Sequence, residues 1–331
     1  MTGTETVQSF NTLNYSGLLY NKANTDTPFL NLISGNVKYT NSVEFVCGQY
    51  YTSEEGVIPA ISETASLTAP DATFVTRSQL SNVTQIFHES VAISYAKQSN
   101  MATLSGVNIA NQSANPQDEL DFQVARKIEK IKRSIEKTFI QGTYNKATAD
   151  TEINKTRGML AAITTNVVDA DGASLNLWLL DEAVRGISNA GGDISNLYAF
   201  VNSANLLQVN GNAIEMGMPI GAAKDSEYGI QVRDVILPVG TTIKLVLGQF
   251  IPEGTALIFN PKYIGPVEQP TPAKGNFFLE ELAKTGAGTK YQIFGQIGLD
   301  HGPEWFAAKI TDLSTTFTAP VGQKVVTVAS A

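Results

Sequence analysis

The sequence predicts an α+β fold with two packed units and several long segments that neither unit can bury. An apolar stripe at helical spacing runs through residues 116–141, and alternating helix and strand patterns fill residues 175–261. Between residues 37 and 96, two strand patterns flank a stretch rich in glycine, proline, serine and threonine. A chain of 331 residues is long enough for about two domains, each with a sizeable core.

Residues 1–36 are interpreted as an arm. One short helix is expected over Leu13–Lys22, and a second starts where Thr27 supplies a cap and Pro28 takes the first helical position. Neither helix can bury its apolar side alone.

Residues 37–96 are predicted to form a long two-stranded excursion. Apolar residues alternate on an outgoing and a returning strand, at Val43, Phe45 and Cys47 and at Val91, Ile93 and Tyr95. The connecting stretch, SEEGVIPAISETASLTAPDA, holds two prolines. A hairpin of this length is marginal in water by itself. It therefore packs either on its own domain or across a neighbouring subunit.

The strongest local pattern predicts a helix over residues 116–141. Asn115 can cap it, Pro116 suits its first position, acidic residues occupy its first turns, and Gly142 can stop it. Its apolar stripe consists of Leu120, Val124, Ile128, Ile131, Ile135 and Phe139. At about 1.5 Å per residue the helix is roughly 39 Å long. Because an average helix has about 11–12 residues, we interpret this one as a spine rather than an ordinary core helix.

A second unit begins near Ser174 and mixes helices with strands. A helix ends at Gly191–Gly192, a buried strand covers 197–201, and Ser203 is expected to cap a short helix. The apolar stripe of the first helix consists of Leu177, Leu180, Val184 and Ile187. Three further strands are expected over Ile230–Leu237, Thr242–Val246 and Ala256–Phe259.

The chain then returns to the first unit. The proline-rich stretch 266–275 is the expected crossing, and Asn276–Lys284 with Lys290–Asp300 form a hairpin whose tip reads TGAGT. Residues from Leu313 onward are rich in threonine, valine and alanine without periodicity, and are interpreted as a tail.

Composition and motifs give no support to an enzyme. The formal net charge of −8 argues against a nucleic-acid-binding surface, and one cysteine, Cys47, excludes a disulfide framework within the chain. We expect Cys47 to be a small buried hydrophobe in a strand. The two histidines, His88 and His301, form no zinc pattern, and His301 beside acidic residues is interpreted as a hydrogen-bonded structural residue. KTGAGTK (284–290) lacks the spacing of a phosphate-binding loop and is interpreted as a hairpin turn. No cofactor or metal is expected.

Long stretches of the sequence resemble the major capsid proteins of tailed bacteriophages, which have the Hong Kong 97 fold. The resemblance covers roughly residues 8–312, and within that family the sequence is similar to the SU-10-type branch. It rests on LNYSGLLYNKANTDTPFLNLI (13–33), TNSVEFVCGQ (40–49), NPQDELDFQVARKI (115–128), NKTRGMLAAITTN (154–166) and GNFFLEELAKTGAGTKYQIFGQIGLDHGPEW (275–305).

The resemblance implies how the chain is divided. Residues 1–36 would be the N-arm, 37–96 the extended loop, 97–174 the peripheral domain with the spine helix 116–141, and 175–261 the axial domain that meets its copies at five- and six-fold axes. Residues 262–312 would return to the peripheral domain and complete the axial domain, and 313–331 would be the tail.

The resemblance also implies partners and a location. The chain would assemble with itself into hexamers and pentamers of an icosahedral or prolate head shell, join a portal protein, and enclose double-stranded DNA without gripping it. Many relatives carry an N-terminal scaffolding segment, whereas here the arm starts close to Met1. Any scaffolding protein, like any decoration protein, would then be separate. We expect synthesis in the host cytoplasm, because no secretory signal is apparent, and residence in the virion without a membrane.

Two further readings concern contacts and alternatives. Glu54, Glu55 and Glu63 make the loop acidic, and Lys284 and Lys290 flank the TGAGT turn, so these residues are candidates for contacts between subunits. The alternative is that these side chains are solvated charges with no partner.

The rival functions are another phage structural component, such as a tail, adhesin or decoration protein, and a secreted hydrolase. A tail protein would favour repeats or a coiled coil, and a hydrolase would need a signal segment and a convergent acid–base cluster.

Overall fold

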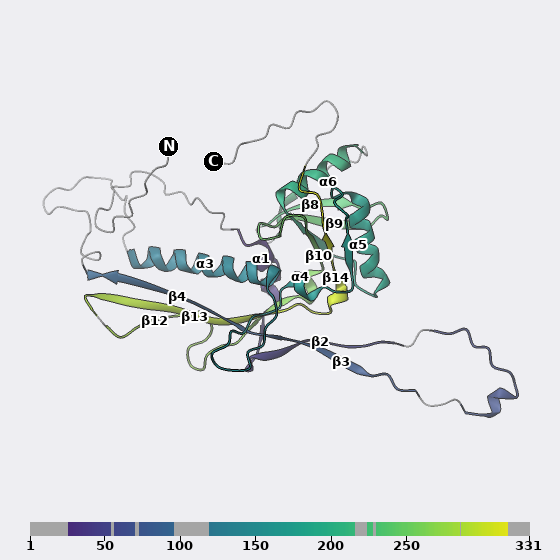
Figure 1. The fold of residues 1–331 in the computed structure, drawn as a ribbon, viewed down its shortest axis with the longest axis horizontal. Coiled ribbons are helices and arrows are strands. Elements are labelled where there is room, and N and C mark those ends of the chain that lie inside the picture. Colours follow the sequence, from purple (N-terminus) through teal and green to yellow (C-terminus); the bar gives the residue numbers. More distant parts are fainter. Residues whose placement is uncertain are drawn as a thin grey trace.

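A computed structural model describes residues 26–53, 56–69, 73–95, 119–215, 224–227, 230–284 and 286–316. Figure 1 shows three parts: a domain that contains α5 and α6, a long slab in which α3 runs beside β4, β12 and β13, and a two-stranded ribbon that extends away from both. The predicted helix Leu13–Lys22, the helix start at Asn115 and Pro116, and residues beyond 316 lie outside the described ranges. Within those ranges, no helix has the length and apolar character that a bilayer crossing requires.

A seven-stranded mixed sheet forms the centre of the domain that contains α5 and α6. Its strand order is β5-β14-β10-β6-β9-β8-β7. The bounds in that order are Val167–Asp169, Ala307–Thr311, Ala256–Phe259, Leu197–Val201, Thr242–Leu247, Ile230–Ile236 and Lys224–Glu227. Only the β14–β5 and β6–β9 pairs are parallel. All five residues of β6 are buried, which confirms the buried strand predicted there.

Two helices accompany this sheet. The first, α5 (Leu177–Asn189), is capped by the Asn176 side chain, which accepts a hydrogen bond from the Leu179 amide at 2.9 Å. For the second, α6 (Ser203–Glu215), the predicted cap is wrong by one residue. The Asn202 side chain, rather than that of Ser203, accepts from the backbone of residue 205, because the helix already begins at Ser203.

The slab is built on a second, five-stranded sheet with β13 at its centre. Its order is β1-β11-β13-β12, and β4 pairs with β13 on the other side. The bounds are Lys38–Tyr39, Gly265–Glu268, Gly288–Asp300, Phe278–Glu281 and Gln85–Ser94 in that order. The antiparallel pairing of β12 with β13 confirms the predicted return hairpin. The predicted turn at its tip includes residue 285, which lies outside the described residues.

The spine helix α3 (Glu119–Gln141) lies against one face of this second sheet (Figure 1). Phe87, Val91 and Ile93 of β4 are buried beneath the helix. Glu89, on the same face of β4, forms ion pairs with Lys127 and Lys130 of α3. The helix stops at Gly142 as predicted. A side chain there would collide with the Thr138 and Thr156 carbonyl oxygens, so only glycine fits the tight exit.

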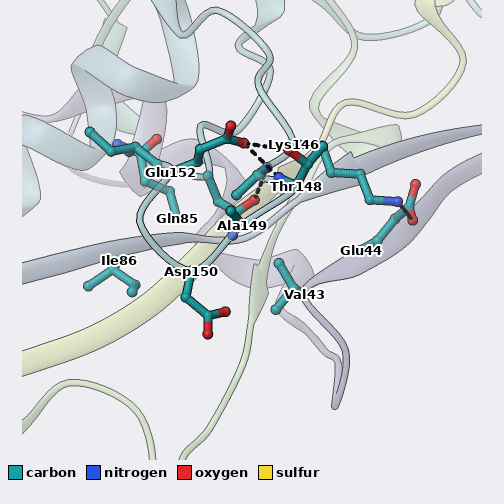
Figure 2. A pocket seen from close by; sticks show the side chains of 12 residues that line it. Val43, Glu44, Gln85, Ile86, Lys146, Thr148, Ala149, Asp150 and Glu152 are labelled. Carbon is teal, nitrogen blue, oxygen red and sulfur yellow. Dashed lines mark hydrogen bonds and ion pairs between the residues drawn. The ribbon is translucent and has the colours of Figure 1, made fainter.

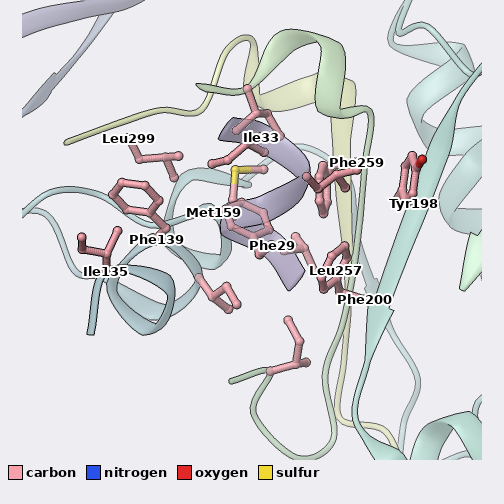
Figure 3. Packing of buried hydrophobic residues seen from close by; sticks show 14 of the residues in the cluster. Phe29, Ile33, Ile135, Phe139, Met159, Tyr198, Phe200, Leu257, Phe259 and Leu299 are labelled. Carbon is pink, nitrogen blue, oxygen red and sulfur yellow. The ribbon is translucent and has the colours of Figure 1, made fainter. Parts of the chain in front are cut away.

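One apolar core joins the two sheets, and the arm helix α1 (Pro28–Ile33) sits in it. Phe29 meets the rings of Phe200 and Phe259 edge-on, with centroid distances of 5.9 and 5.2 Å. Figure 3 shows Phe29 and Ile33 of α1 among Phe139 of α3, Met159 of α4 (Met159–Ala162) and the strands of the first sheet. The end of the arm is therefore part of the folded core.

The ribbon consists of β2 (Glu44–Tyr51) and β3 (Arg77–Val83), paired antiparallel. The predicted return strand through Val91 and Ile93 is wrong as a partner of β2. Those residues belong to β4 and pair with β13, where α3 buries them. Alternation with period two fits either partner, so the pattern alone could not choose between them.

The predicted tail also starts later than expected. Leu313 is buried, and the Gln208 side chain of α6 donates hydrogen bonds to the carbonyl oxygens of Ser314 and Thr316 at 2.8 and 3.0 Å. The Gln208 side chain thus satisfies two carbonyl groups that have no partner in a sheet or helix. The threonine-rich composition gave no sign of this contact.

Candidate assembly surfaces

The outer half of the ribbon exposes large apolar side chains. Between β2 and β3 the described residues hold one short 3₁₀ turn, Ala65–Leu67, which is kept by local hydrogen bonds such as that from the Ala65 amide to the Ser62 hydroxyl. The exposed side chains are Val57 83%, Ile58 90%, Ile61 70%, Leu67 85% and Phe74 88%. Fully burying a side chain of this kind is worth about 1.5–3 kcal/mol. An uncovered apolar segment of this length marks an interaction surface.

The base of the ribbon is fixed by a buried polar network. The side-chain amide of Asn82 donates to the Leu299 and Arg157 carbonyl oxygens at 2.8 and 3.1 Å, and its oxygen accepts from the Arg157 amide at 2.8 Å. Lys38, beside the ribbon, makes an ion pair with Asp300 at the end of β13. These contacts set the direction in which the ribbon leaves the molecule.

Cys47 lies at the same base, where the register of β2 against β3 shifts between Val46 and Gly48. The thiol is buried and lies 3.7 Å from the Leu299 carbonyl oxygen. Burial raises its pKa to about 12. The prediction of a small buried cysteine in a strand is confirmed, and strand alternation places its side chain on the same buried face as Phe45.

Among the described residues, the outer part of the second sheet is uncovered on the face opposite α3, whereas Phe45 of the ribbon packs on the inner end of that face at Gly298. On that face the strand register places His88 beside Phe294 and Phe294 beside Phe278, with ring centroids 6.2 and 5.9 Å apart. Lys290 lies on the same face, four residues away from Phe294 along β13. We call these four residues the open-face row. Sequence reasoning missed it, because it depends on the pairing of β4 with β13.

The candidate contact residues stand apart within one chain. Glu63 is exposed on the ribbon, Lys284 and Lys290 are exposed near the β12–β13 turn, and Glu54 and Glu55 lie outside the described residues. In Figure 1 the outer end of the ribbon and the β12–β13 turn lie at opposite ends of the molecule. A single chain therefore does not bring Glu63 together with Lys284 and Lys290.

A cavity of about 570 Å³ lies beside the ribbon base, where Val43 and Ile86 face the loop that follows α3 (Figure 2). Lys146 from that loop makes an ion pair with Glu44, and this hydrogen bond holds the pKa of Glu44 below its usual range. Glu152 accepts hydrogen bonds from the Thr148 amide and hydroxyl. The carboxylates of Glu44 and Glu152 are thus engaged in contacts that hold this loop in place.

His301 is hydrogen-bonded, as predicted. It is buried, its Nδ1 lies 2.8 Å from the Gly302 carbonyl oxygen, and burial lowers its pKa. The neighbouring acids are engaged elsewhere, since Asp300 pairs with Lys38 and Glu304 binds the amides of residues 164 and 165. Over the described parts of the chain, no three histidine, cysteine, aspartate or glutamate side chains gather in a way that could hold a metal ion.

A spine helix beside a curved sheet, a mixed domain at one end and a ribbon left uncovered are the parts of a capsid shell protein of the Hong Kong 97 type. Solved capsids share this fold. The capsid of cyanophage A-1(L) has a TM-score of 0.59 at 12% identity, covering 95% of this chain and 99% of that one. The capsid of cyanophage P-SCSP1u has a TM-score of 0.56 at 11% identity, covering 92% of this chain and 93% of that one. The SrpI encapsulin of Synechococcus elongatus PCC 7942 has a TM-score of 0.57 at 13% identity, covering 92% of this chain and 96% of that one.

The family model of the SU10 major capsid protein matches residues 2–314. The chain belongs to this family, and it is a shell protein of a phage capsid and hence a component of the virion. No curated protein matches it. The resemblance seen in the sequence is confirmed, as is the mixed fold.

Proposed function

We propose that the chain builds a closed icosahedral or prolate head shell from hexamers and pentamers of itself, and that the ribbon of each copy lies across an adjacent copy. The observation that carries this proposal is the row of exposed apolar side chains on the ribbon, which its own chain leaves uncovered within the described residues. Repeated over a closed shell, contacts of modest strength add up to a stable assembly. The role is structural and involves no catalytic step.

The expected division of the chain is kept in this proposal, with one boundary moved. The arm (1–36), the peripheral domain around the spine helix and the axial domain at the five- and six-fold axes keep their roles. The extended loop, expected over 37–96, ends at Val83 instead, because β4 pairs with β13 and packs on α3.

The acidic ribbon residues Glu54, Glu55 and Glu63 are proposed to approach Lys284 and Lys290 of the adjacent copy. Lys290 belongs to the open-face row, so an apolar and acidic ribbon would meet an aromatic and basic surface. Exposed ion pairs are worth only about 0–1 kcal/mol each. Apolar burial therefore supplies most of the free energy, and the charges orient the contact.

The same proposal includes partners outside the chain. A portal protein would occupy one vertex, scaffolding and decoration proteins would be separate chains, and double-stranded DNA would be enclosed without specific contacts. Synthesis in the cytoplasm of the host bacterium precedes assembly.

The decisive experiment changes the apolar side chains of the ribbon and leaves the rest of the chain intact. The variant Ile58→Ser/Ile61→Ser/Leu67→Ser should remain folded, by circular dichroism, and should give no shells in negative-stain electron microscopy. Deletion of residues 53–70 should have the same effect. The matched control Thr64→Ser/Thr68→Ser/Thr73→Ser changes the same segment conservatively and should assemble. Normal shells from the apolar variant, or its unfolding, would contradict the proposal.

The charged contacts are tested separately. Lys284→Glu/Lys290→Glu should weaken assembly most at low ionic strength, because salt screens exposed charges over about 10 Å at 0.1 M. If light scattering shows the same assembly at every salt concentration, these lysines are solvated charges without a partner.

A further inference from the structure

A glutamate lies buried where the arm meets the spine helix. Glu136 of α3 is 0% exposed, and its Oε2 accepts a hydrogen bond from the Leu30 amide of α1 at 3.2 Å. The Phe29 amide also hydrogen-bonds to this carboxyl group. The two partners are 106 residues apart in sequence.

This carboxyl group takes the place of a missing cap. The first amides of any helix lack partners within the helix, and the Thr27 side chain, which the sequence predicts as the cap, makes no capping bond. Glu136 satisfies the first amides of α1 from another element. The apolar side of α1 is at the same time buried between the two sheets (Figure 3). Glu136 is thus the polar half of the contact that holds the arm in place.

Among the residues that the structure describes, the groups around Glu136 do not neutralise a negative charge there. α1 (PFLNLI) and α4 (MLAA) carry no charged residue. Asp26, just before α1, is acidic and disfavours a second negative charge nearby. Arg133, one turn earlier on α3, makes no ion pair with Glu136, and its buried Nε has no hydrogen-bond partner. Glu136 Oε1 also has no partner.

We propose that Glu136 is a proton-dependent latch, which holds the arm on the spine helix in its neutral form and weakens that contact when it ionises. This inference goes beyond the shell function and does not rest on it. Release of α1 would expose Glu136 on the surface of α3, where water solvates the carboxylate. Docking of the arm and binding of one proton are therefore linked.

The sign of the linkage follows from the docked state. Burial raises the pKa of Glu136 to about 8, above the usual value near 4.5 that it regains on release. Docking is therefore strongest below the released pKa and weakens as the pH rises through the docked pKa. By this linkage the docking equilibrium falls by about fifty-fold between pH 6 and pH 8.

Hydrogen exchange of the unassembled full-length protein tests the latch directly. The protection factors of the amides of residues 29–33, corrected for the intrinsic exchange rate, are measured from pH 5.5 to pH 9. In the wild-type protein they should fall about fifty-fold between pH 6 and pH 8. In Glu136→Gln they should be independent of pH, because the amide still accepts a hydrogen bond but cannot ionise.

Two further variants complete the test. Glu129→Gln, on the same helix and paired with Arg126, should keep the pH dependence of the wild-type protein. Glu136→Ala, without an acceptor, should show low protection at every pH. Protection that does not change with pH in the wild-type protein overturns the latch, whatever the variants do. So does an equal pH dependence in Glu136→Gln. Shell formation is not part of this readout, so the outcome is independent of the proposed assembly.

Discussion

Replacing Asn82 with alanine should loosen the base of the ribbon more than any change on its surface. The Asn82 side chain is fully buried and makes three long-range hydrogen bonds, to the Leu299 carbonyl and to both backbone groups of Arg157. The alanine variant leaves these groups buried without their partner. Each such group costs about 1–3 kcal/mol, and the residual cavity admits some water, so the expected loss is about 3–6 kcal/mol.

Urea unfolding of the unassembled protein, followed by tryptophan fluorescence, measures this loss. Trp305 meets the Tyr50 ring edge-on next to the ribbon base, at a centroid distance of 5.0 Å, and it contributes to the signal together with Trp178. The control Ser81→Ala removes an exposed hydrogen bond to Glu44 and should change stability by less than about 0.5 kcal/mol. A loss below about 1 kcal/mol for Asn82→Ala would show that water or rearrangement replaces the network.

Three other outcomes are expected from the same structure. Phe29→Ala should cost about 3–5 kcal/mol in urea unfolding, because its ring is fully buried between the two sheets; a cost under about 1 kcal/mol would mean that α1 is not part of the core. Cys47 should resist thiol reagents at pH 8 until the protein unfolds, since it is 3% exposed and its pKa is about 12; reaction in the native state would show that the ribbon base opens. Because residues 39–96 contain no lysine, shells boiled in detergent with reductant should give one band near 35.5 kDa, whereas a ladder of multiples would reveal covalent links through other residues.

The sequence predicted those elements whose pattern is complete within one segment. The spine helix, the buried strand 197–201 and the return hairpin each carry their own periodicity and stop signals, and all were confirmed. The return strand was assigned to the wrong partner, because the alternation at Val91 and Ile93 says which face is buried and not which strand lies beside it. That choice depends on β13, about two hundred residues away in the chain.

The candidate surfaces were predictable only in part, for the same reason. The composition between β2 and β3 indicated a segment without a core of its own, and the structure leaves its apolar side chains exposed. The open-face row depends on three strands in register. The capping role of Glu136 was hidden because its position fits the polar side of an amphipathic helix. A local rule assigned the cap to Thr27, and a tertiary contact replaced it.

The arrangement of the ribbon makes a final prediction about which force holds the shell together. Polar contacts such as those of Asn82 lie at the base, where they serve the ribbon's own chain, whereas the outer half presents apolar side chains. Burial of each such side chain is worth about 1.5–3 kcal/mol, against about 0–1 kcal/mol for an exposed ion pair. Screening by salt acts on the ion pairs alone. Preformed shells should therefore stay intact, by light scattering and electron microscopy, in about 1 M sodium chloride, where the screening length is about 3 Å. Disassembly in high salt would mean that charge, rather than apolar burial, dominates the contacts between copies.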